Sequence, residues 1–132
     1  MGYDGSSSSE KALESALSMA NSMDSTVEII AVVRPSEPAT SPDLHADLDD
    51  ARAVFEKALR RIAQGAMGEG LRIETDVLVG HPAQQIIQRA EMSRADLIVL
   101  GRRGTSTFKE LVLGSISERV LAAAHCPVLI TR

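Results

Sequence analysis

Short apolar runs of strand type alternate with longer stretches of helical periodicity along this chain, and that order limits its fold more than any other feature. The run Thr26–Val33 is β-branched and nearly all apolar at its carboxyl end, as in a strand covered on both faces. Residues 96–100 form a second buried run of this type. Because parallel strands are joined by right-handed helical crossovers, the alternation predicts an α/β fold in which helices cover both faces of a parallel sheet.

The other elements are predicted from the same two periodicities. Apolar residues every three or four positions predict helices over 10–21, from Asp43 to the glycines at 65–70, from Pro82 onward and over 115–124. Further strands are expected over 73–79 and over Val128–Thr131, and three prolines make 34–42 a loop. Ser7 and Glu10 have the spacing of a capping box for the first helix. With 132 residues and no internal repeat, the chain is expected to form a single domain over residues 1–132.

A glycine motif lies between the strand at 96–100 and the final helix. Gly101, Gly104, Gly114 and Ser115 have the spacing G-x-x-G-x9-G-S. Glycine lets backbone N–H groups approach an anion closely, and the first turn of a helix offers unpaired N–H donors at the positive end of its dipole. Ligands of parallel α/β sheets bind at the carboxyl ends of the strands. The motif therefore favours phosphate binding there, although a loop that merely needs positive φ angles would use the same glycines.

Composition and charge narrow the class of partner. A net charge of −4, no tryptophan, one tyrosine and two phenylalanines argue against nucleic-acid binding, which needs a basic face and stacking aromatic rings. No stretch is apolar enough to suggest a membrane span, and the first residues lack the pattern of an export signal. The single cysteine, Cys126, fits a reducing compartment. We therefore expect a cytoplasmic protein whose partner is a small molecule or another protein.

Several segments resemble the universal stress protein family. They are 3–6 (Tyr-Asp-Gly-Ser), 31–33 (Ala-Val-Val) and 126–130 (Cys-Pro-Val-Leu-Ile), and the glycine motif is similar to the ATP-binding motif of the family's nucleotide-binding branch. The resemblance covers essentially the whole chain. It implies a Rossmann-like domain with a five-stranded parallel sheet in the order 3-2-1-4-5. It also implies a homodimer in which the last strands, Val128–Thr131, of two subunits pair.

The resemblance implies roles for individual residues in binding ATP or AMP, with or without Mg²⁺. Asp4 would lie beside the adenosine part of the ligand, and backbone groups of Val32 would hydrogen-bond the edge of the adenine. Gly101 and Gly104 would let the loop backbone reach the ribose and the phosphates. Apart from the resemblance, Arg102 and Arg103 are candidate phosphate contacts, although side chains in the middle of a glycine loop usually point to solvent. The N–H and hydroxyl groups at the start of the last helix would hold phosphates, and they belong to Gly114, Ser115, Ile116 and Ser117. Ser115 has a simpler alternative role as the helix N-cap.

The beginning of the chain differs from this family pattern. Members have four or five apolar residues before the aspartate, which form the central strand, whereas only Met1, Gly2 and Tyr3 precede Asp4 here. An unusually short first strand leaves its neighbours with unpaired backbone groups, at a cost of about 1 kcal/mol or more for each buried group. We therefore expect the native start of the protein to lie upstream of Met1.

No catalytic residues and no metal ligands are predicted. The G-x-G-x-x-G fingerprint, the Walker lysine motif and a nucleophile elbow are all missing, and His45, His81 and His125 are scattered. The resemblance, together with the glycine motif, implies a nucleotide-dependent stress-response switch with at most slow ATP hydrolysis. Two alternatives remain open. One is a nucleotide-independent protein-interaction module of the same fold, and the other is an adenylyl-transferring or dinucleotide-dependent enzyme, which the missing motifs disfavour.

Overall fold

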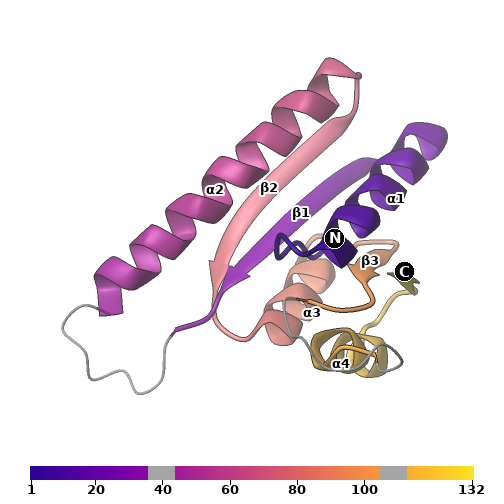
Figure 1. Cartoon of the computed structure of the whole chain (residues 1–132). Helices are drawn as coiled ribbons and strands as arrows, with labels where there is room; N and C mark the ends of the chain where they lie inside the picture. Colours follow the sequence, from indigo (N-terminus) through magenta and orange to yellow (C-terminus); the bar gives the residue numbers. More distant parts are fainter. Residues whose placement is uncertain (36–43, 105–112) are drawn as a thin grey trace.

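The computed structural model describes residues 1–35, 44–104 and 113–132 (Figure 1). Helices and strands alternate as the sequence predicts, in the order α1 (Ser7–Met23), β1 (Thr26–Val33), α2 (Leu44–Gly68), β2 (Arg72–Val79), α3 (Pro82–Met92), β3 (Ile98–Gly101), α4 (Ser115–Ala123) and β4 (Val128–Thr131). The bounds of β1 and β4 are the predicted ones. Most of the loop predicted over 34–42, and Asp43 as the predicted start of the second helix, lie outside the described residues. In the described part of the chain, no helix is long and apolar enough to cross a membrane.

The first helix begins three residues earlier than predicted because Ser6 caps it. The Ser6 backbone is extended, and its Oγ accepts a hydrogen bond from the N–H of Ser9 at 3.2 Å. The predicted capping box is therefore wrong: Ser7 is already helical, and Glu10 accepts a hydrogen bond from the Tyr3 hydroxyl. Serine occupies every position from 6 to 9, so the local sequence offers several equivalent caps. The contacts of the preceding turn select one of them.

The strands form two parallel sheets of two strands each. β1 pairs with β2 along eight residues, and β3 pairs with β4 along four. The first residues of the chain run between the two sheets: Ile30 donates its N–H to Met1 O (2.9 Å), Tyr3 donates to Ile30 O (2.8 Å), and Gly2 donates to Val99 O (3.3 Å). These residues form only an isolated bridge with β1. The single five-stranded sheet implied by the resemblance is thus not formed by the described residues, because so short a segment cannot make a full ladder.

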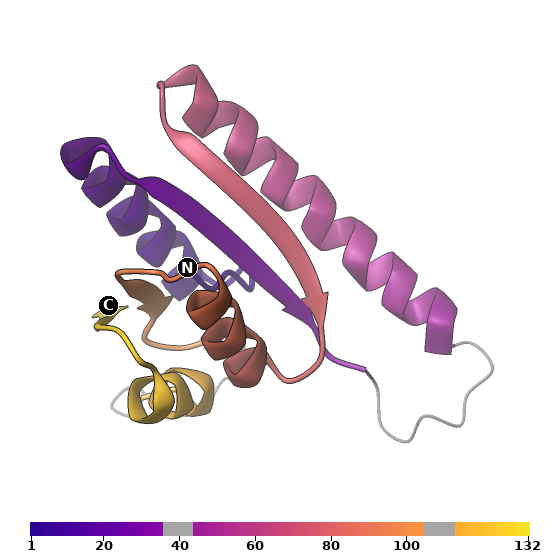
Figure 2. The ribbon, with the colours of Figure 1, turned by 180° about the vertical axis from the view of Figure 1, so that it is seen from behind.

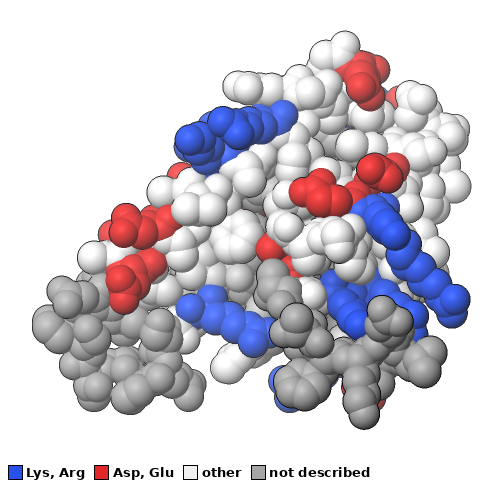
Figure 3. Space-filling model, viewed as in Figure 1, with Lys and Arg blue, Asp and Glu red and all other residues white. Residues whose placement is uncertain are grey.

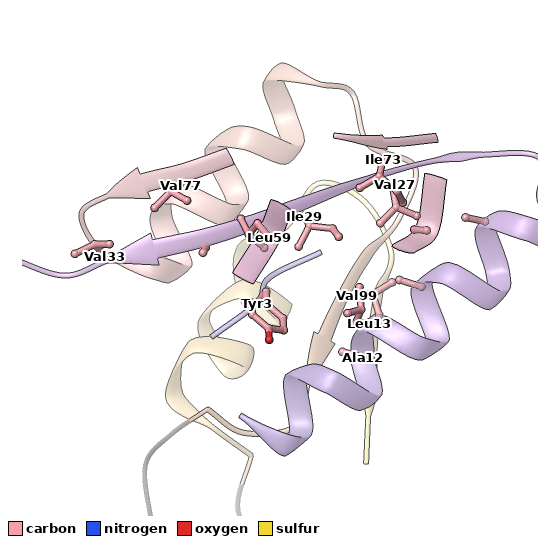
Figure 4. Packing of buried hydrophobic residues seen from close by; sticks show 14 residues of the cluster. Tyr3, Ala12, Leu13, Val27, Ile29, Val33, Leu59, Ile73, Val77 and Val99 are labelled. Atoms are coloured by element: carbon pink, nitrogen blue, oxygen red, sulfur yellow. The ribbon is translucent and has the colours of Figure 1, made fainter. Parts of the chain in front are cut away.

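Helices cover both faces of the sheets, as predicted (Figures 1 and 2). On one face, α1 packs against β3 and β1, and α2 packs against β2 and β1, in a cluster that includes Ile29, Leu59 and Val99 (Figure 4). On the other face, α3 and α4 pack against Ile98 and Leu100. Successive side chains of a strand point to opposite faces, so the short strand β3 contributes to both clusters.

The buried side chain of Leu59 offers a test of the packing between α2 and the sheet. Leu59 is 1% exposed, whereas Leu121 on α4 is 53% exposed. Leu59→Ala is expected to lower the free energy of unfolding by about 2–5 kcal/mol, because the cavity it leaves is only partly refilled. The matched change Leu121→Ala is expected to alter it by about 0.5 kcal/mol or less. Urea denaturation measures both, and equal losses in the two variants would contradict this packing.

In a chain that begins at Met1, the α-ammonium group makes stability depend on pH. It donates to the carbonyl oxygen of Glu28, and burial lowers its pKa from 8.0 to about 6, with the Glu28 carboxylate opposing the shift. Below pH 6 both the folded and the unfolded chain hold the proton, and folding bears the full cost of burying the charge. Above pH 8 neither holds it and the cost disappears.

The free energy of unfolding is therefore expected to rise by up to about 3 kcal/mol between these two pH values, because the unfolded state binds more protons there. Chemical denaturation across this pH range measures the rise. Chain acetylated at Met1 has the same side chains and is the control that should not show it. An equal rise in both samples would assign the pH dependence to other groups.

Candidate functional site

Three segments meet at the carboxyl ends of β1 and β3. They are the turn at residues 4–6, the glycine segment 101–104 after β3, and the first turn of α4 at 114–117. Gly114 donates its N–H to Arg102 O at 2.9 Å, so the glycine segment and α4 are bonded directly. This end of a parallel sheet is where α/β folds bind ligands. The structure thus brings the predicted glycine motif and Asp4 into one place.

The carboxylate of Asp4 lies against Gly104. Its Oδ1 accepts hydrogen bonds from Ser6, from the N–H at 3.0 Å and from Oγ at 2.6 Å. A Cβ atom on Gly104 would clash with its Oδ2. Only glycine therefore lets the segment approach this carboxylate so closely. Asp4 fixes the turn through one oxygen and presents the other toward the glycine segment as an acceptor for a hydroxyl donor.

The first turn of α1 holds the glycine segment from a second side. A Cβ atom on Gly101 would lie 2.5 Å from the backbone carbon and oxygen of Ser8. Ser8 Oγ accepts a hydrogen bond from the N–H of Arg103 at 3.2 Å. Sequence reasoning did not assign Ser6 and Ser8 to the site. The run of serines directly after Asp4 was the signal that could have found them.

The start of α4 supplies N–H donors. The N-cap is Gly114, with extended backbone angles (φ −65°, ψ 143°) and no side-chain cap, so Ser115 is the first helical residue and not the cap. The first-turn N–H groups of Ser115, Ile116 and Ser117 consequently lack a capping side chain in the described part of the chain. Ser117 is buried, and its hydroxyl donates to Gly101 O at 2.9 Å. Ser117 therefore offers the site its backbone N–H, while its hydroxyl ties α4 to the end of β3.

Val32 and Arg102 flank these segments. Alternate residues of a parallel strand hydrogen-bond to opposite sides, and Ile30 bonds the chain start, so Val32 directs its N–H and C=O to that same side. Arg102 is half-buried, and its N–H donates to Thr131 O at 2.9 Å. Lys and Arg side chains gather at the lower right of the face in Figure 3, near the place of α4 in Figure 1. Positive charge there would attract an anion.

Tyr3 lies beneath the site and was missed by sequence reasoning. It is 8% exposed, and its hydroxyl donates to Glu10 on α1. Burial, together with the hydrogen bond to Glu10, raises the pKa of Tyr3 to about 12. The side chain is therefore neutral at physiological pH and links the residue before Asp4 to the first helix. Among the described residues, no group of three His, Cys, Asp or Glu side chains lies where it could hold a metal ion.

The whole chain matches a protein-family model. The model of the universal stress protein family matches residues 1–132, and the chain therefore belongs to that family. A curated relative, universal stress protein MJ0531 of Methanocaldococcus jannaschii, is 36% identical over 134 residues, which span 98% of this chain and 78% of the relative.

Solved structures give the same assignment. Universal stress protein UspA from Lactobacillus plantarum superposes with a TM-score of 0.91 and is 28% identical, over 99% of this chain and 94% of that chain. A universal stress protein solved in complex with cAMP superposes with a TM-score of 0.75, is also 28% identical, and is matched over 100% of this chain and 94% of its own. The chain thus has the α/β fold of the family.

Because Gly101 approaches α1 closely, replacing glycine by alanine is expected to have opposite effects on stability at Gly101 and at Gly65. Gly101→Ala is expected to destabilise the protein by about 1–3 kcal/mol, because the added methyl group meets the Ser8 backbone. Gly65→Ala, in α2, meets nothing within 4 Å and is expected to stabilise by about 0.5–1 kcal/mol. Thermal and urea unfolding measure both. Stabilisation by Gly101→Ala would show that the two segments are not in contact.

Proposed function

We propose that this protein binds an adenine nucleotide, ATP or AMP, at the carboxyl ends of β1 and β3 and acts in the cytoplasm as a nucleotide-dependent stress-response switch. The observation that carries the proposal is the uncapped first turn of α4, bonded to a glycine segment that packs on Asp4. Unpaired N–H groups at a helix start are suited to phosphate groups. The universal stress protein with bound cAMP supports the choice of ligand, because cAMP contains both adenine and phosphate.

The chemistry of each segment fits a different part of such a ligand. The N–H groups of residues 115–117 would hold phosphates next to the N-cap Gly114, whose own N–H is bonded to Arg102 O, and the Arg102 side chain would be a further cationic contact. Backbone groups of Gly101 and Gly104 would lie along the ribose and phosphates. The Oδ2 of Asp4, which lies against Gly104, would accept from a ribose hydroxyl, and the Val32 backbone would pair with the adenine edge. Mg²⁺ could accompany a triphosphate through the ligand's own oxygens.

A switching mechanism follows from the bonds between the glycine segment and β4. Arg102 N–H donates to Thr131 O, and Thr131 Oγ1 donates to Leu100 O at 3.4 Å. Any movement of residues 101–104 on nucleotide binding would therefore be transmitted to the last strand. We propose that Val128–Thr131 pairs with its copy in a homodimer, since its apolar residues are only half-buried in the single chain. Nucleotide state would then change the dimer edge rather than drive a rapid reaction.

The second candidate function is a protein-interaction module that works without nucleotide. The favouring observation is the incomplete sheet, because the turn at Asp4 depends on a segment held by few hydrogen bonds.

Slow hydrolysis of ATP is compatible with the first candidate function, the nucleotide-dependent switch. Asp4 is the carboxylate that the described residues bring against the glycine segment, and one carboxylate without a positioned partner supports little acceleration.

Calorimetric titration with ATP, AMP and cAMP tests the proposed site. Wild-type protein is expected to bind at least one of them, and Gly114→Val to weaken binding at least about tenfold, because its side chain crowds the helix start and Arg102 O, 3.1 Å from an added Cβ. Gly65→Ala is the control that should bind as wild type does. Failure of folded wild-type protein to bind any of the three would overturn the proposal. Partner capture that is unchanged in Gly114→Val would favour the interaction module.

A further inference from the structure

Helix α2 carries a stripe of exposed side chains on the side away from its core contacts. Its inner face, which includes Phe55 and Leu59, packs on β2 and β1. Side chains three or four positions apart lie above one another on a helix. Five exposed residues have this spacing and form what we call the α2 stripe: Asp47, Asp50, Val54, Lys57 and Arg61.

The charges of the α2 stripe are separated along the helix axis. Asp47 and Asp50 lie toward the amino end of α2, and Lys57 and Arg61 lie toward its carboxyl end. Along the left side of Figure 3, where Figure 1 shows α2, acidic side chains lie toward the start of the helix and basic ones further along it. Val54 lies between the two signs and is 68% exposed. The stripe thus has an acidic half, a basic half and an apolar midpoint.

This arrangement is unfavourable within a single chain. Asp47 lies one turn from Asp50, and like charges at this spacing destabilise a helix by about 0.2–0.5 kcal/mol for each pair. Lys57 and Arg61 repel in the same way. The helix dipole accounts for Asp47 in the first turn, but the last turn of α2 has no basic residue. No ion pair among the described residues includes a charged side chain of the stripe. The complementary charges therefore have to come from another molecule.

A second copy of the stripe supplies these charges. Asp47 and Arg61 are each seven residues from Val54, which is about 10.5 Å at about 1.5 Å per residue. Two antiparallel α2 helices with a two-fold axis at Val54 therefore place Asp47 of one copy beside Arg61 of the other. Asp50 and Lys57, four and three residues from Val54, meet in the same way. The two Val54 side chains meet on the axis, whereas a parallel pair would bring like charges together.

We propose that the α2 stripe is a docking surface for a second copy of this chain, in an antiparallel helix pair centred on Val54. Charge complementarity carries the choice of occupant, because the stripe turned by 180° is its own complement. Exposed ion pairs contribute about 0.2–1 kcal/mol each, and one helix face is small beside the roughly 1,200 Å² at which stable interfaces begin. The association is therefore weak, and salt weakens it further.

The α2 stripe lies away from the other surface for which self-association is proposed. β2, which α2 covers, pairs with β1, and β4 pairs with β3, so the two strands lie at opposite edges of the fold (Figures 1 and 2). Pairing through α2 leaves β4 accessible. Two separate self-complementary contacts on one chain would join subunits into assemblies larger than a dimer.

Complementary charge reversals test the pairing. An acid-to-base variant carries Asp47→Lys and Asp50→Lys, and a base-to-acid variant carries Lys57→Glu and Arg61→Glu. Each stripe then has one sign, so sedimentation velocity at about 20 mM salt is expected to show self-association at least about tenfold weaker than in the wild type. An equimolar mixture of the two variants has opposite charges at every contact and is expected to recover the wild-type association.

Two outcomes of this experiment would overturn the proposal: either variant associating as strongly as the wild type, or a mixture as weak as its components. The acid-to-base variant changes the formal net charge from −4 to zero, which by itself favours association, so its weakening is not an effect of net charge. Asp49→Lys and Arg60→Glu change the same kinds of charge on α2 outside the stripe, and both are expected to associate as the wild type does.

Cysteine cross-linking tests the position of the axis. Val54→Cys places a thiol on the proposed axis, and Ala53→Cys places one about 100° around the helix. Both changes are made with Cys126→Ser, which removes the native thiol. Diamide, which takes up the two thiol hydrogens, is expected to link two Val54→Cys chains through a disulfide and to leave Ala53→Cys chains largely unlinked. Equal linkage of the two variants would contradict the antiparallel pair centred on Val54.

Discussion

The contact between Gly101 and the Ser8 backbone is the constraint on which the candidate site depends. No side chain fits between the end of β3 and the first turn of α1, so the two backbones touch directly. From one side the Ser117 hydroxyl donates to Gly101 O, and from the other Ser8 Oγ accepts from the N–H of Arg103. Because backbone atoms move less freely than long side chains, N–H groups and one carboxylate are held in fixed positions before any ligand arrives.

The carboxyl and amino ends of β1 and β3 differ in how closely they are packed. The first residues of the chain lie between these two ends. At the carboxyl end, Gly101 packs directly on the Ser8 backbone, and Gly104 packs on the carboxylate of Asp4. At the amino end, the same layer contains a cavity and a buried charge. Tyr3 connects the two, since its N–H bonds β1 and its side chain is buried against α1. Tyr3 therefore ties the turn at Asp4 to both β1 and α1.

Long periodic segments were predicted correctly, as was the start of α3 at Pro82, whereas the N-caps of two helices were not. The eight residues of β1 have the predicted bounds because a largely β-branched, apolar run is stable as a strand in a covered sheet. The caps of α1 and α4 were each placed one residue too late, at Ser7 instead of Ser6 and at Ser115 instead of Gly114. A cap is chosen by a single hydrogen bond or by the backbone of the preceding segment, and neighbouring serines are equivalent in local sequence.

The sequence by itself determined the order of helices and strands, the glycine positions and membership of the universal stress protein family. These depend on side-chain periodicity and spacing, which are local properties. Only the tertiary structure decided that Asp4 lies against Gly104, that Ser117 turns its hydroxyl to Gly101, and that the sheet is divided around a cavity. Such features arise from contacts between residues far apart in the chain, where small differences in backbone distance decide which groups pair and which space remains.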